Sequence, residues 1–180
     1  MAKKTLNIQF NLLDVMYGVV LSYGFNFFGA ASSVSSKIFF FLSYLIVIAD
    51  WIFIHELYSE IEYKSRVLFF SDIAVLFFVS RVIAASVASP EAFFMWMWIL
   101  FASYFFWDFV ACRVIPPERW ASFKLSDFLT SVFFFIMWML IRNGLIRKGY
   151  FVTIIGVIAC FVVLFYWFYA EKLHMKRILR

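Results

Sequence analysis

The chain has 180 residues, of which 66% are hydrophobic and 24% aromatic, and it carries a formal net charge of +5. Soluble domains are roughly 45–50% apolar even when glycine is counted, so the composition excludes a soluble globular protein. With only 6 Gly, 3 Pro and 2 Cys, it also excludes a collagen-like chain and a disulfide scaffold. The composition indicates that this protein binds the lipid bilayer, which surrounds most of its surface.

Long apolar runs predict six membrane-spanning helices, because a helix of about 20 apolar residues crosses a bilayer. Serine, glycine, proline or charged residues separate the runs, and all three prolines fall in these connections, where a helix can end. We therefore expect an all-α integral membrane protein with a single transmembrane domain over residues 1–180. The six runs cover residues 9–30, 38–57, 66–88, 92–112, 125–143 and 150–170.

The distribution of lysine and arginine predicts the orientation. If the N-terminus is cytoplasmic, eleven of the 16 basic residues lie on the inner side, so the positive-inside rule places both termini in the cytoplasm. Residues 171–180 form a basic cytoplasmic tail of the kind that meets anionic lipid headgroups, which explains the positive charge without nucleic acid. The short connections favour a bacterial inner membrane.

A weak internal repeat indicates a possible hairpin duplication. A shift of 58 residues places Asp14 on Asp72 and Asp50 on Asp108. Asp127 lies near the start of the fifth predicted helix, much as Asp72 lies near the start of the third. The first two predicted helices could therefore form a hairpin that the next two repeat.

All five aspartates lie within the predicted spans, although an ionised carboxylate inside a bilayer is costly. With both termini cytoplasmic, each falls in the inner third of its span, so together they predict an acidic layer facing the cytoplasm. Besides Asp14, that layer contains Asp50, Asp72, Asp108 and Asp127.

Two structural explanations of these aspartates remain open beside an ion pathway. Carboxylates near a helix N-terminus can accept backbone hydrogen bonds and oppose the helix dipole, which would explain Asp14, Asp72 and Asp127. Asp50 and Asp108, near helix C-terminal ends, could instead form buried ion pairs that fix helix register. The candidate partners for such pairs are Arg66, Arg81 and Arg113.

Polar and small residues follow one side of the first predicted helix. At 100° per residue they fall within an arc of about 120°. Such a stripe either lines a water-filled path or forms a helix–helix seam, and both interpretations stay open. The members of this polar stripe are Asn11, Asp14, Gly18, Ser22 and Asn26.

The sequence offers little for catalysis or metal binding. His55, His174, Cys112 and Cys160 show no metal-ligand spacing, and the chain has neither a glycine-rich phosphate loop nor a nucleophile elbow. We expect no enzyme activity, cofactor or metal site. The tryptophans are interpreted mostly as lipid-facing mass and interface belts.

Two segments carry a resemblance to a known family. Residues 66–72 read Arg-x-x-x-Phe-Ser-Asp, which resembles the signature of the endosomal and lysosomal potassium channel family and its six-helix bacterial homologues. Residues 41–55 are similar to that family's second helix, where a tryptophan, here Trp51, is followed one turn later by a histidine, here His55.

The resemblance implies a homo-oligomer, specifically a tetramer, with a central cation path lined by the first helix. Asp14 would be the acid of that helix. Val15, Val19 or Ser22 would lie near the constriction.

We expect a small, cation-selective ion channel or ion-permeation protein whose path the polar stripe lines. In this view His55, Arg66 and Arg113 fix register or form ion pairs. The alternative is a non-conducting membrane anchor or effector subunit, for example of a host-defence complex. It would recruit a soluble partner at the cytoplasmic face through residues 113–124 and the basic tail.

Overall fold

The computed structural model describes residues 8–60, 65–113, 121–147 and 149–178, with side chains for 9–55, 65–113, 125–147 and 149–169. The described chain forms six α-helices and one short 3-10 helix. They are α1 (Ile8–Gly24), η1 (Phe25–Ala30), α2 (Val34–Glu60), α3 (Arg66–Ala88), α4 (Pro90–Ala111), α5 (Ala121–Arg142) and α6 (Tyr150–Ile178).

All six predicted helices are present, and each is long and apolar enough to cross a membrane. The third matches its predicted bounds, whereas the first tightens into η1 after Gly24. The last continues to Ile178, so most of the predicted tail extends α6 rather than forming a separate segment. No glycine or proline follows Gly156, so nothing in the sequence stops that helix earlier.

Local chemistry explains where several helices begin and end. The Ser65 hydroxyl accepts the Leu68 N–H at 3.2 Å at the start of α3. Ser89 caps α4 in the same way, with Pro90 in the first helical position, where its missing N–H costs nothing. Gly144, at φ +71°, closes α5 with the paired backbone bonds of a Schellman motif.

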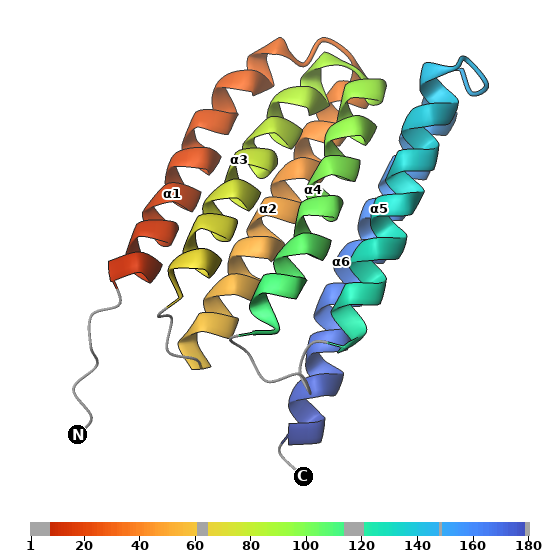
Figure 1. The fold of residues 1–180 in the computed structure, drawn as a ribbon. Coiled ribbons are helices and arrows are strands. Elements are labelled where there is room, and N and C mark those ends of the chain that lie inside the picture. The colour runs from red at the N-terminus through yellow and green to blue at the C-terminus, as the bar shows by residue number, and fades with distance from the viewer. Residues whose placement is uncertain (1–7, 61–64, 114–120, 148, 179–180) are drawn as a thin grey trace, which may run out of the picture.

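The helices pack as a bundle with α2 and α4 at its centre. In Figure 1, α1, α3, α4 and α5 follow one another across the front, while α2 lies behind α3 and α4, and α6 lies behind α5. The helices that α2 contacts are α1, α3, α4 and α6. The start of α1 and the end of α6 lie at the same end of the bundle.

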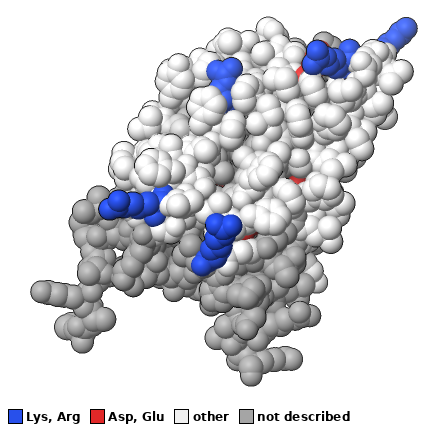
Figure 2. Space-filling model, in the orientation of Figure 1, with Lys and Arg blue, Asp and Glu red and all other residues white. Residues whose placement is uncertain are grey.

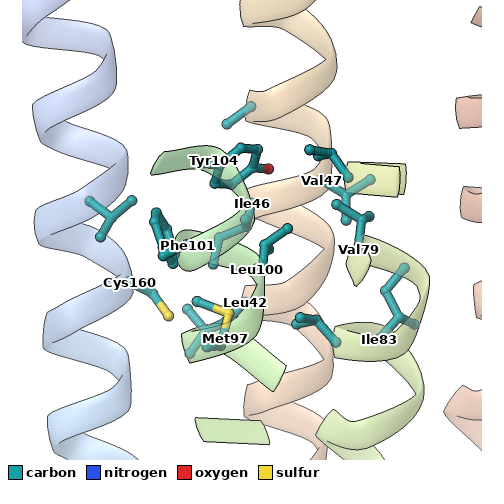
Figure 3. Packing of buried hydrophobic residues seen from close by; sticks show 14 of the residues in the cluster. Leu42, Ile46, Val47, Val79, Ile83, Met97, Leu100, Phe101, Tyr104 and Cys160 are labelled. Atoms are coloured by element: carbon teal, nitrogen blue, oxygen red, sulfur yellow. The ribbon is translucent and has the colours of Figure 1, made fainter. Parts of the chain in front are cut away.

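Burial differs strongly between helices. The apolar stretch of α2 is 56% buried, whereas that of α1 is only 17% buried. The core of α2, α3 and α4 is aromatic and aliphatic; Figure 3 shows part of it, with Leu42 and Ile46 from α2 and Met97 and Phe101 from α4. The face shown in Figure 2 is mostly white, with small acidic patches, and its basic side chains lie towards the upper and lower parts of the described surface. This pattern fits a protein surrounded by lipid.

Candidate functional site: a buried acidic chamber

Three aspartates surround a small cavity inside the bundle. Asp50 comes from α2, Asp108 from α4 and Asp127 from α5, and Tyr104 of α4 adds a hydroxyl. The volume of the cavity that water can occupy is about 30 Å³. We call it the acidic chamber. Its remaining wall is apolar or aromatic and consists of Phe53, Ile54, Val75, Trp107 and Trp167.

The polar residues of the acidic chamber are almost completely withdrawn from the surface. The exposed fraction is 2% for Asp50, 1% for Asp108, and 6% for both Asp127 and Tyr104. Tyr104 and Asp108 share one face of α4 because they lie four residues apart. The interior position of α2 and α4 therefore brings acids from three helices together at one level of the bundle.

Asp50 is held by a tyrosine from another helix. The Tyr17 hydroxyl of α1 donates a hydrogen bond of 2.5 Å to Asp50 Oδ2. Tyr17 is itself buried, at 2% exposure. Because a buried carboxylate without donors is strongly disfavoured, this bond anchors α1 to α2 and fixes the Asp50 side chain.

The polar atoms of the acidic chamber that make no well-aligned hydrogen bond in the described part of the chain include Tyr104 Oη and Asp127 Oδ1. The Tyr104 hydroxyl, drawn in red in Figure 3, lies within hydrogen-bonding reach of Asp50 and within electrostatic range of Asp127. The Asp127 carboxyl interacts in turn with that of Asp108. Native interiors satisfy nearly all buried polar groups, so two such atoms around one cavity point to a functional site.

Each of the three helical hairpins carries an aspartate–tryptophan pair. The aspartate is the seventh residue of α1, α3 or α5, and the tryptophan lies on the following helix. In the first two pairs the indole N–H donates to the carboxylate, at 2.9 and 2.6 Å. In the third it lies within hydrogen-bonding reach. The pairs are Asp14–Trp51, Asp72–Trp107 and Asp127–Trp167, which extends the sequence repeat from two hairpins to three.

Capping does not explain Asp72. The cap of α3 is Ser65, and Asp72 lies almost two turns further along the helix. Its side chain is 1% exposed and accepts the indole N–H of Trp107. Its role is a contact between α3 and α4 rather than a helix start.

The arginines considered as partners lie at exposed positions, namely Arg66, Arg81 and Arg113. The Arg81 guanidinium lies over the Trp96 ring, 5.0 Å from its centroid. The donors that the structure describes for Asp50 and Asp72 are aromatic: the Tyr17 hydroxyl and the Trp107 indole N–H.

Asp14 and His55 form a separate, more open site. His55 Nδ1 lies 3.5 Å from Asp14 Oδ1, and the two side chains are 46% and 35% exposed. The His55 ring packs beside Phe10 and Trp51. The structure therefore brings Asp14 together with the Trp51 and His55 of the family resemblance, outside the acidic chamber.

The polar stripe lies mainly on α1 and is called the α1 stripe from here on. Most of it points away from the bundle. Asn11, Gly18, Ser22 and Asn26 are exposed, and Asp14 is half-buried. The face of α1 that packs inward carries Leu13 and Tyr17 instead. The stripe therefore lines no path through a single chain and is available to a neighbouring molecule.

Sequence reasoning missed the aromatic donors of the acidic chamber. Trp107 and Trp167, interpreted as lipid-facing, are buried. Tyr17 was placed on no functional face, although it holds Asp50. The recurring separation of 35 to 40 residues between an aspartate and a later tryptophan was the available signal.

Among the described residues, no three His, Cys, Asp or Glu side chains are grouped so that they could hold a metal ion. No protein-family model, curated protein or solved structure matches this chain.

The chemistry of the acidic chamber follows from its own groups. Adjacent carboxylates in a medium of low polarity repel each other unless a proton or a cation lies between them. Among the side chains that the structure describes, no basic one lines the cavity. The arrangement is therefore suited to take up positive charge from outside the protein.

Proposed function

We propose that this chain is an integral membrane protein that moves cations across the bilayer, with the acidic chamber as the binding step on the path. The observation that carries the proposal is that three buried carboxyl groups surround one cavity, where Tyr104 Oη and Asp127 Oδ1 make no well-aligned hydrogen bond in the described chain. Ionisable residues within membrane spans typically mark ion pathways and proton relays.

The sign of the transported charge follows from the groups around the cavity. All ionisable carboxyl groups there are aspartates, and the remaining polar groups are a tyrosine hydroxyl and indole N–H groups. An anion would meet like charge on three helices. A cation would offset that charge where the surrounding apolar wall strengthens the attraction.

The orientation proposed from the basic residues places both termini in the cytoplasm and the acidic chamber in the inner third of the bundle. The proposed membrane is a bacterial inner membrane. At this position in the inner third of the bundle, the acidic chamber would receive cations through the cytoplasmic end.

The exposed α1 stripe supports an assembly of several copies. Polar side chains such as Asn11 and Asn26 are unfavourable against acyl chains but stabilise contacts between membrane helices. We therefore include a homo-oligomer in the proposal, and the family resemblance specifies a tetramer. In such an assembly the α1 stripe would line a path shared between copies.

Ion flux into liposomes tests the proposal, with two matched aspartate variants beside the unmodified protein. Asp127→Asn removes the ionisable group of the acidic chamber and keeps its size. Asp72→Asn is the control, since it makes the same change at the same position of its helix but outside the cavity lining. We expect cation flux that falls at least about tenfold in Asp127→Asn, the effect of about 1.4 kcal/mol on a barrier, and persists in Asp72→Asn.

An absence of cation flux from folded, reconstituted protein would overturn the proposal. The anchor or effector alternative would then be preferred. The residues on which that alternative depends lie mostly outside the described part of the chain, namely 114–120 and the side chains of 121–124 and 170–180.

A further inference from the structure

We infer that the acidic chamber binds protons, together with one or two water molecules, rather than a metal cation. This inference rests on the proposed function and names its ion. In this inference, Asp127, Tyr104 and Asp50 form a relay that passes H⁺ between α5, α4 and α2.

The size of the cavity favours the proton. A water molecule needs about 10–15 Å³ of such space, so about 30 Å³ accommodates roughly two waters. A metal ion would need either its hydration shell or a ring of oxygen ligands in its place. The cavity has no room for the former.

The arrangement of oxygens also favours the proton. The described acidic side chains do not gather in threes around one point, as a metal ion would require. They meet instead in pairs: Asp127 with Asp108, and Asp50 with Tyr17. Two oxygens facing each other across a hydrogen bond are the geometry in which a proton is shared or passed on.

Tyr104 occupies the gap between these pairs. Its hydroxyl lies within hydrogen-bonding reach of Asp50 and interacts electrostatically with Asp127. A hydroxyl both donates and accepts, so it can receive a proton on one lone pair and release its own on the other side. Water in the cavity would bridge the remaining distance.

Each transfer is balanced without a further reagent. One O–H bond breaks as the next forms, and the proton leaves a donor oxygen for a lone pair on the acceptor. Reorientation of the Tyr104 hydroxyl then restores the starting arrangement. The driving force is the transmembrane proton gradient or voltage alone.

Asp127 faces titratable groups from several helices. Those on α4 are Asp108 and Tyr104, and α2 contributes Asp50. Tyr17 of α1 reaches the cluster through its bond to Asp50. The α3 acid, Asp72, is bonded by Trp107, and α6 contributes the indole of Trp167, which does not titrate.

The decisive variant is Tyr104→Phe. It keeps the ring and removes a hydroxyl that makes no well-aligned hydrogen bond in the described part of the chain, so a purely structural role predicts little loss of stability and no loss of flux. The proton relay predicts that proton flux falls at least about tenfold, equivalent to about 1.4 kcal/mol on the barrier. Tyr44→Phe is the matched control, since that hydroxyl donates to the Leu21 carbonyl on α1, a different part of the bundle.

The measurement uses the full-length chain in liposomes that contain a pH-sensitive dye. An imposed voltage drives H⁺ in buffers whose only other cation is bulky and organic, and K⁺ and Na⁺ are assayed separately. We expect proton flux without either metal ion, reduced in Tyr104→Phe and in Asp127→Asn but preserved in Tyr44→Phe. Circular dichroism and gel filtration confirm folding of each variant.

Other outcomes separate the two proposals. Flux of K⁺ or Na⁺ without proton flux would overturn the proton assignment and leave cation transport standing. Flux of no ion from folded protein would overturn both. Unchanged proton flux in Tyr104→Phe would contradict the proposed relay through the acidic chamber.

Discussion

The α1–α2 hairpin and the acidic chamber use the same residue types in different surroundings. Asp14 and Asp127 occupy the same position in their helices, and each is paired with a tryptophan of the next helix. Asp14 lies at an edge where 35% of its side chain is exposed, with His55 beside it. Asp127 is 6% exposed and keeps an oxygen without a donor in the described chain.

The comparison teaches that burial, rather than residue type or helix position, gives an aspartate its role here. At the edge, solvent or headgroups can stabilise the carboxylate. In the acidic chamber only the protein, water or a bound cation can do so. Matched substitutions in the two regions should therefore have effects of different size.

The largest contrast is expected between two tryptophan variants. Trp107→Phe removes the indole N–H that Asp72 accepts at 2.6 Å inside the bundle, and a hydrogen bond to a charged group contributes about 1.5–3 kcal/mol. Trp51→Phe removes the matching bond at the exposed edge, for which we expect less than about 1 kcal/mol. Unfolding in mild detergent measures both, and equal losses would contradict the contrast.

The second contrast concerns two buried tyrosines near Asp50. Tyr17→Phe removes the donor to that carboxylate and should lower the free energy of unfolding by about 1.5–3 kcal/mol. Tyr104→Phe removes a hydroxyl that makes no well-aligned hydrogen bond in the described chain and should leave stability unchanged to within about 1 kcal/mol. Parallel thermal unfolding curves test the difference, which a loss of stability in Tyr104→Phe would refute.

The third contrast compares two glycines. A Cβ at Gly156 would lie 2.5 Å from the Phe39 ring, which is itself stacked on Phe93. Gly156→Ala should therefore cost about 1–3 kcal/mol through overpacking between α6 and α2. A Cβ at Gly18 meets nothing, so Gly18→Ala should stabilise α1 by up to about 1 kcal/mol. Unfolding midpoints give the comparison, and a tolerated Gly156→Ala would mean that α6 packs more loosely than described.

The smallest effect on the fold is expected on the outer face of α1. Ser22→Leu changes an exposed side chain and should alter the stability of a single copy by less than about 0.5 kcal/mol. If copies assemble through the α1 stripe, the same change should shift the protein from oligomer to monomer. Size measurement in detergent by light scattering distinguishes the two, with Leu12→Met, at an exposed position of α1 outside the stripe, as the control. An unchanged oligomer would place the interface elsewhere.

Much of the architecture could be predicted from the sequence, because hydrophobic length and helix-stopping residues act locally. Six apolar runs, the serines at 65 and 89 and Gly144 locate six helices without knowledge of their neighbours. The acidic residues could be assigned to one level for the same reason, since each position follows from its distance along a helix. The site residues Asp50, Asp108 and Asp127 were therefore identifiable as a group.

Only the tertiary structure decided which side of each helix meets another. The α1 stripe was a candidate for an internal path, and packing turned most of it outward while Tyr17 was turned inward. Tryptophans that composition assigns to lipid became donors to buried acids. The physical reason is that helix rotation and neighbour choice depend on side-chain packing across the whole bundle. A spacing pattern along one helix contains no information about that packing.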